Sequence, residues 1–240
     1  MDLKIKDVAE LLNVSETTIR RWLAEGKIPA YRLNHQFRFS RIEIEDWVMS
    51  CKMGQEKHSV SKKEEAEEGK KLVGTQQFSL FRAIHKGVVL DQVEGDDKES
   101  VIRNAVKEIA KELNLDAEMV TDLLLDRERM MPTALSHGIG VPHTRELLLR
   151  GPYDVIAVVY PKKPIDYGAL DNLPVHTLFF LLACEDKRHL HLLAKLAHLA
   201  SGQQSLQFLE TRPNKAALLD HIKFWESAKN AREEVILLTS

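Results

Sequence analysis

A histidine at position 143 ends the run Ser136–His143, which reads SHGIGVPH. Gly138 and Gly140 allow close backbone approach beside it, and Pro142 stiffens the chain directly before it. An imidazole that is rigidly held next to open backbone has the surroundings of a nucleophile. We therefore treat His143 as a candidate covalent acceptor.

A second group of histidines, His189, His191 and His198, follows Cys184. Asp186 is expected to cap a helix, which places His189 near the third helical position, in the electropositive first turn. This field favours a neutral imidazole, which can donate a hydrogen bond to a phosphoryl oxygen, while backbone N–H groups of the same turn attract the anion. Chance clustering among ten histidines is one alternative. Metal binding is another, but the i,i+2 spacing puts two ligands on different sides of a helix.

The elements around these histidines follow a mixed α/β pattern. Helical periodicity covers residues 98–113 and 117–126, and a strand is expected at 87–90. The short apolar runs 153–160 and 175–183 are bounded by Pro or Asp, as buried strands are. The pattern predicts a mixed α/β sandwich, with residues 127–143 between its helices and strands.

The first 26 residues predict two short helices joined by a turn. The first helix has an apolar stripe, Ser15 caps the second helix, which runs from Glu16 to Glu25, and Gly26 ends it. The apolar stripes are formed by Val8, Leu11 and Leu12 and by Ile19, Trp22 and Leu23. The other face of the second helix carries hydroxyls and guanidinium groups, on Thr17, Thr18, Arg20 and Arg21. This arrangement has the form of a helix-turn-helix, with a plain solvated helix face as the alternative.

Residues 31–39 predict a hairpin with a three-residue loop, Asn34–Gln36, in which Leu33 faces Phe37 and Arg32 faces Arg38. Two opposed cations repel, so the pairing favours an anion such as a DNA phosphate. Across residues 17–41 only Glu25 opposes six cations, an excess of five positive charges, on Arg20, Arg21, Lys27, Arg32, Arg38 and Arg41. A capping box at Ser40–Glu43 opens a last helix that buries Ile44, Trp47 and Val48, completing a winged helix-turn-helix.

Composition and charge limit the remaining possibilities. The chain has 240 residues, 34 Lys and Arg against 36 Asp and Glu, and a net charge of -2, so nucleic-acid contact requires a local basic cluster. Its longest apolar run, residues 178–184, is too short for a membrane span, and the charged first dozen residues exclude a secretory signal, which predicts a cytoplasmic protein. The two cysteines have no CxxC spacing, so neither a disulfide nor a zinc finger is expected.

A highly charged segment divides the chain. Residues 55–77 have no aromatic residue and ten charges, and cannot bury a core. We expect four regions: a DNA-binding domain at 1–54, a charged linker at 55–77, an α/β domain at 78–228 and a C-terminal tail at 229–240.

The N-terminal segment resembles the excisionase/MerR-like helix-turn-helix family from Leu3 to about Val48. The similarity lies in V-S-x-x-T-I-x-R-W, the G-K-I-P turn and R-F-S-R-x-E-I-E-D-W. The resemblance implies binding to double-stranded DNA. It places Thr17, Thr18, Arg20 and Arg21 near the major groove and Arg32 and Arg38 on the wing.

Residues from about Gly87 to Trp225 resemble the type-2 enzyme IIA domains of the sugar phosphotransferase system (PTS), in the fructose/mannitol and nitrogen-regulatory branch. The shared motifs are L-L-x-R-E-R, G-I-G-V-P-H, P-I-D-Y-G-A-L-D-x-L-P-V-x-T-L-F-F-L-L and H-L-x-L-L-A-K-L-A. The resemblance implies that His143 accepts a phosphoryl group, that the Arg127 guanidinium steadies it, and that His189 is the second active-site histidine. Histidine attack on phosphorus gives a labile phosphoramidate and needs mainly positioning and charge neutralisation.

The combination predicts a phosphorylation-responsive regulator that takes its phosphoryl group from an HPr-like phosphocarrier and binds double-stranded DNA. Such a chain is a phosphoryl carrier more than a stand-alone catalyst, and no cofactor or membrane contact is expected. The main alternative is a phosphorelay component that passes phosphate from His143 to a IIB partner, with the N-terminal domain as a protein-interaction or localisation module. A third is a constitutive DNA binder with a dimerising IIA fold. A regulated target protein and a homodimer remain open.

Coupling between the domains has two physical routes. A phosphorylated loop within about 8 Å of the arginine surface would compete with DNA for its cations, since charges at greater distance are screened. We expect this competition to weaken DNA binding. Otherwise coupling requires a change in domain packing or in dimerisation.

Overall fold

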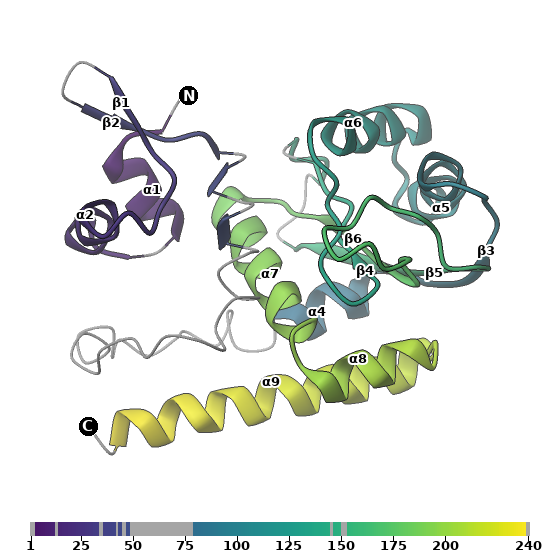
Figure 1. The fold of residues 1–240 in the computed structure, drawn as a ribbon. Coiled ribbons are helices and arrows are strands. Elements are labelled where there is room, and N and C mark those ends of the chain that lie inside the picture. The colour runs from purple at the N-terminus through teal and green to yellow at the C-terminus, as the bar shows by residue number, and fades with distance from the viewer. Residues whose placement is uncertain are drawn as a thin grey trace.

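The computed structural model contains a small N-terminal unit and a larger α/β unit (Figure 1). It describes residues 3–12, 14–33, 36–41, 43–44, 47–48, 79–144, 146–149 and 153–238. The expected linker at 55–77 and Cys51 lie outside the described residues. Among the helices of the described part, none is long and apolar enough to cross a bilayer.

The N-terminal unit contains α1 (Ile5–Leu12), α2 (Glu16–Ala24), β1 (Tyr31–Leu33) and β2 (Gln36–Arg38), and residues 41, 43, 44, 47 and 48 are helical. Its core has the predicted composition, because the apolar stripes of α1 and α2 meet Phe39 and Ile44, both of which are fully buried. Trp22 and Trp47 pack at 5.3 Å between ring centroids. The last helical residues therefore pack on α2 and share a core with Phe39, the residue that follows the hairpin.

The sheet of the α/β unit has the strand order β3-β5-β6-β4. Its strands are β3 (Val89–Val93), β4 (Ile139–Gly140), β5 (Val155–Pro161) and β6 (Thr177–Leu182). The central pair, β5 and β6, is antiparallel, while β3 and β4 each run parallel to their neighbour. Every residue of β5 and β6 is buried, as expected for continuous apolar runs covered on both faces.

Helices cover both faces of this sheet. On one face, α5 (Lys98–Leu113) and α6 (Ala117–Met130) pack on Val155, Ala157 and Val159. The opposite face, with Ile156, Val158 and Tyr160, is covered by α4 (Ser79–Lys86), α7 (Asp186–Leu199), α8 (Gln203–Glu210) and α9 (Lys215–Leu238). The two sets of β5 residues alternate because successive strand side chains point to opposite faces. The predicted mixed α/β sandwich is confirmed.

Helix boundaries follow their local signals, with one difference of consequence. Asp97 caps α5 through a capping box, and Asn114 ends it in the left-handed conformation at φ 54°. Helix α6 continues to Met130, past the expected end at Asp126, so Arg127 lies in a helix and not in a loop. Arg127 and Glu128 are both buried there.

A buried ion pair ties three helices together behind the sheet. The Lys195 Nζ atom of α7 lies 2.5 Å from Oε1 of Glu226, which belongs to α9. The two Glu226 oxygens also accept the backbone N–H groups of Leu80 and Phe81 at the start of α4, at 3.2 and 3.1 Å. The carboxylate thus satisfies N–H groups that a helix start leaves without intrahelical partners.

Candidate functional site

His143 lies just after β4 and is held by both backbone and side-chain contacts. It bridges to Leu181 of β6, and its imidazole is fully buried. The Nδ1 atom lies 2.8 Å from the Val141 carbonyl oxygen. A carbonyl can only accept, so Nδ1 carries a proton, and in the neutral ring the lone pair is on Nε2. Nε2 is therefore the ring nitrogen that could act as a nucleophile.

His189 faces His143 from the first turn of α7. The two ring centroids are 5.2 Å apart and the ring planes meet at 64°. The helix begins at Asp186, and Glu185 holds the capping position, so the expected cap at Asp186 is wrong by one residue. His189 still lies in the first turn, with its N–H bonded to the Glu185 carbonyl at 2.9 Å. The structure thus brings together the two predicted active-site histidines.

The other two histidines of this group have different surroundings. The Nε2 atom of His191 lies 3.1 Å from Ser79 Oγ, and His198 packs edge-on against Trp225 with centroids 5.3 Å apart. Within the described ranges, no group of three His, Cys, Asp or Glu side chains is arranged to hold a metal ion.

Arg127 lies in the last turn of α6 as a buried side chain whose Nη1 donates to the Met131 carbonyl at 2.9 Å. Its neighbour Glu128 links α6 to the segment that carries His143. Glu128 accepts the Thr133 N–H at 3.1 Å, and the Thr133 carbonyl accepts the Val141 N–H at 2.9 Å. The end of α6 is therefore connected by hydrogen bonds to the residue that holds the His143 ring.

Sequence reasoning assigned no role to Glu128, although it stands inside the L-L-x-R-E-R motif. The Tyr167 hydroxyl donates to it at 2.9 Å, the Thr133 hydroxyl also donates to it, and Lys98 Nζ lies 3.6 Å away. Burial, reinforced by the Glu128 charge, raises the pKa of Tyr167 well above its ordinary value. Tyr167 therefore stays a hydrogen-bond donor and helps fix Glu128 beside Arg127.

Asp154, at the start of β5, is a second residue that the sequence did not single out. Its Oδ2 accepts from Arg188 Nε and Nη2 at 2.8 and 2.7 Å, and its Oδ1 accepts the Cys184 N–H at 3.1 Å. Arg188 directly precedes His189, so this ion pair fixes the first turn of α7 on the sheet. An aspartate before an apolar strand carries no local signal of such a role.

The predicted DNA-reading residues lie on or next to α2 and the hairpin. Ser15 caps α2 as expected, with its hydroxyl accepting the Thr18 N–H at 3.1 Å, and Gly26 follows the helix at φ 65°. Thr17 and Arg20 are exposed, while Arg20 and Arg21 lie 3.6 and 3.8 Å from Glu16 and Glu25. Weak exposed pairs of this kind leave the guanidinium groups able to exchange partners.

The hairpin register differs from the prediction. Arg32 pairs with Phe37, Arg38 with Tyr31 and Leu33 with Gln36, so the loop is two residues long. The expected repulsion between Arg32 and Arg38 is therefore wrong. The Arg38 guanidinium instead donates to Gln36 Oε1 at 2.9 Å and to the Phe37 carbonyl at 3.2 Å. A loop shorter by one residue shifts every cross-strand partner.

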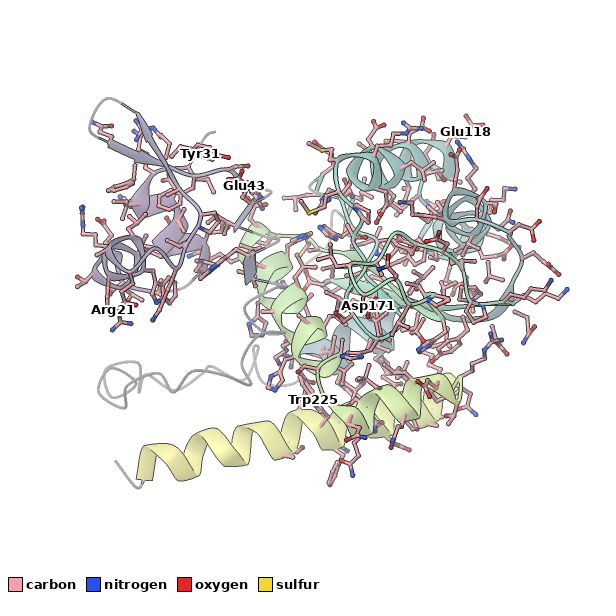
Figure 2. All side chains as sticks on the ribbon, in the orientation of Figure 1. Arg21, Tyr31, Glu43, Glu118, Asp171 and Trp225 are labelled. Atoms are coloured by element: carbon pink, nitrogen blue, oxygen red, sulfur yellow. The ribbon has the colours of Figure 1, made fainter. Side chains whose placement is uncertain are left out.

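Arg41, one of the six counted cations, has a partner in the α/β unit. The Arg41 Nη2 and Nη1 atoms contact the two carboxylate oxygens of Asp186 at 2.6 and 2.8 Å. Arg41 therefore faces the α/β unit and not the side that carries Arg21, which Figure 2 shows pointing away from α7.

Comparison with known proteins supports both units. Residues 83–225 match the family profile of the phosphoenolpyruvate-dependent sugar phosphotransferase system, EIIA 2, and residues 3–52 match a helix-turn-helix domain. The chain is 33% identical over 142 residues to a nitrogen regulatory protein of Pseudomonas aeruginosa, covering 58% of this chain and 91% of that protein. A crystal structure of the nitrogen regulatory protein IIA-Ntr from Neisseria meningitidis superposes with a TM-score of 0.53 at 25% identity, covering 60% of this chain and 98% of that one.

The N-terminal unit has a separate similarity. It is 48% identical over 54 residues to the transcriptional repressor DcmR of Methylorubrum extorquens, which covers 22% of this chain and 20% of DcmR. The EIIA 2 profile spans more than half of the chain and includes both facing histidines. The chain therefore belongs to the EIIA 2 family of the phosphoenolpyruvate-dependent sugar phosphotransferase system, and it carries a helix-turn-helix domain in front of its EIIA domain.

Proposed function

We propose that this chain is a phosphorylation-responsive regulator: it accepts a phosphoryl group on His143 from an HPr-like phosphocarrier and binds double-stranded DNA through its helix-turn-helix domain. The observation that carries the proposal is the histidine pair, in which His143 Nδ1 is held by the Val141 carbonyl and the His189 ring lies 5.2 Å away. The similarity to nitrogen regulatory proteins and to a transcriptional repressor in one chain supports the two halves.

In the proposed step, the His143 Nε2 lone pair forms a bond to phosphorus as the bond from phosphorus to the donor atom breaks. The Nδ1 proton stays on the ring, hydrogen-bonded to the Val141 carbonyl. This bond holds the ring so that Nε2 keeps one direction during attack. His189 would donate a hydrogen bond to a phosphoryl oxygen, and Arg127 would offset the charge of the group.

The helix-turn-helix would bind DNA through α2, with Thr17, Thr18, Arg20 and Arg21 toward the major groove and Arg32 and Arg38 at the wing. Support comes from the exposed first turn of α2 and from the local excess of cations. The position of Arg21, pointing away from α7, argues against direct competition between a phosphoryl group and DNA for this surface (Figure 2).

The test is labelling of the purified chain by an isotopically labelled phosphocarrier, followed by DNA titration with and without the label. One acid-labile, base-stable label per chain is expected, and His143→Asn should abolish it. Asparagine suits this buried position because its amide can still donate to the Val141 carbonyl, which alanine cannot. His85→Ala, at an exposed histidine of α4, should label normally.

Two outcomes contradict the proposal. Full labelling of His143→Asn would move the acceptor to another residue. Normal labelling with onward transfer to a IIB protein, and no binding to duplex DNA at low salt, would favour the phosphorelay alternative.

A further inference from the structure

The first turn of α7 contacts three separate parts of the molecule with four successive residues. Asp186 and Lys187 contact the helix-turn-helix unit, Arg188 binds Asp154 just before β5, and His189 packs on His143. Figure 1 shows this end of α7 next to the N-terminal unit. One helical turn therefore joins the DNA-binding unit to the phosphoryl-acceptor site.

Both polar and apolar contacts hold the helix-turn-helix unit in this position, which we call the docked arrangement. Arg41 makes a two-pronged ion pair with Asp186, at 2.6 and 2.8 Å, and its side chain is only 21% exposed. Lys187 Nζ lies 3.3 Å from Glu10 Oε1. Leu11 and Leu12, on the apolar stripe of α1, pack against both the N-terminal core and the core beneath α7.

In the docked arrangement the acceptor site is closed. His143 is 0% exposed and His189 is 3% exposed. A phosphocarrier must bring its phosphorus to the Nε2 atom, which requires a path through whatever covers the two rings. Asp186, which pairs with Arg41, lies three residues before His189 on α7. This spacing puts the Asp186 and His189 side chains on neighbouring positions of one helix face.

We propose that docking of the helix-turn-helix unit closes the phosphoryl site, so that this unit must leave α7 before a donor reaches His143. Once attached, the phosphoryl group opposes redocking because it adds bulk beside two histidines that are closed off from solvent in the docked arrangement. The inference rests on the proposed function and names the regulation of the same site.

The two equilibria are linked: if phosphorylation favours the undocked state, undocking favours phosphorylation by the same free energy. The signal to the DNA-binding unit is then its release from α7. The DNA-reading face need not touch the phosphoryl group, in agreement with the outward position of Arg21 (Figure 2).

Docking can be measured in the full-length chain with a zero-length carbodiimide, which joins Lys187 to Glu10 only while the two are in contact. Mass spectrometry quantifies the cross-linked peptide, and Glu10→Gln verifies its identity. Labelling rates by the phosphocarrier are measured on wild type, Arg41→Gln and Lys6→Gln. Lys6→Gln is the matched control, because it removes one positive charge from an exposed position of α1.

We expect phosphorylation to lower the cross-link yield of wild type about three- to tenfold, the range for loss of one partly buried ion pair. Arg41→Gln should lower the yield of unphosphorylated protein and raise its labelling rate by a similar factor, whereas Lys6→Gln should match wild type. Unchanged yield on phosphorylation would overturn the inference, as would an Arg41→Gln variant that undocks without faster labelling. If neither wild type nor Arg41→Gln takes label from a donor that labels another EIIA protein, the proposed function itself fails.

Discussion

The ion pair between Asp154 and Arg188 provides the sharpest test of how the site is held, because its two members differ in burial. The Asp154 side chain is 6% exposed, whereas the Arg188 side chain is 41% exposed. In Arg188→Met the buried carboxylate keeps, among the described residues, the N–H and the thiol of Cys184 as donors. Asp154→Asn instead leaves a guanidinium that water can reach.

The costs should differ accordingly. We expect Arg188→Met to lower the free energy of unfolding by about 2–3 kcal/mol, near the lower end for breaking a buried pair. Asp154→Asn should cost about 1 kcal/mol, because the remaining cation is partly solvated. In the double variant the loss should be smaller than the sum of the two, since the members share one interaction.

The same substitutions should slow phosphoryl transfer to His143. Without this pair, the first turn of α7 loses its ionic contact with β5, and His189 moves relative to the His143 ring. Because transfer depends on the exact placement of the reacting groups, we expect this movement to lower the labelling rate by on the order of ten- to a hundredfold. We expect Arg188→Met to show the larger decrease.

Chemical denaturation and labelling kinetics test both statements on the same protein samples. Arg103→Met is the matched control, because Arg103 pairs with Glu99 on the exposed face of α5, where the two side chains are 47% and 53% exposed. It should cost no more than about 0.5 kcal/mol and leave labelling unchanged. Equal losses for Asp154→Asn and Arg188→Met, or a normal labelling rate in Arg188→Met, would refute the reasoning.

Three further outcomes are expected. Glu226→Gln should destabilise the chain by about 3 kcal/mol and Lys195→Met by about half as much. The first removes the anion that Lys195 Nζ contacts, whereas after the second the carboxylate still accepts the N–H groups of Leu80 and Phe81; denaturation curves in which Lys195→Met is the worse variant would contradict this. Burial lowers the pKa values of His176 and His221 below their ordinary value of 6.5. At a pH below 6.5 the unfolded chain therefore binds more protons than the folded chain, so the free energy of unfolding decreases as the pH falls. Titration of stability against pH should show a shallower decline for His221→Gln. DNA affinity should fall with salt at a slope of about -4, since Arg41 is bound to Asp186 and about four or five cations remain for phosphates; a flat salt response would exclude DNA phosphate contacts.

Local patterns in the sequence were sufficient for most helices and buried strands. Helix α5 begins and ends where the pattern predicts, because its capping box and its left-handed Asn114 are local signals. Strands β5 and β6 were recognisable as short apolar runs, since burial on both faces requires apolar side chains throughout. The motif around His143 identified the acceptor candidate for a similar reason, as its glycines and proline act on neighbouring backbone.

The hairpin register depended on more than strand propensity. Alternating residues predicted two strands correctly, but the choice between a two- and a three-residue loop decides which residues pair. The bridge between Leu3 and Phe39 holds Phe39 outside β2, and the strand ends at Arg38. The partner of Phe39 thus comes from the start of the chain, where no pattern in the hairpin could indicate it.

Only the tertiary structure decided the contacts between residues that lie far apart in the chain. Asp154 meets Arg188, Glu128 meets Tyr167, and Arg41 meets Asp186 across 145 residues. A charged residue has the same local pattern whether it lies in water or against a distant partner, so its own neighbours do not reveal the pairing. Burial creates the requirement for a partner, and burial is a property of the packed chain. The sequence therefore identified the two histidines, whereas folding determined what holds them and what contacts them.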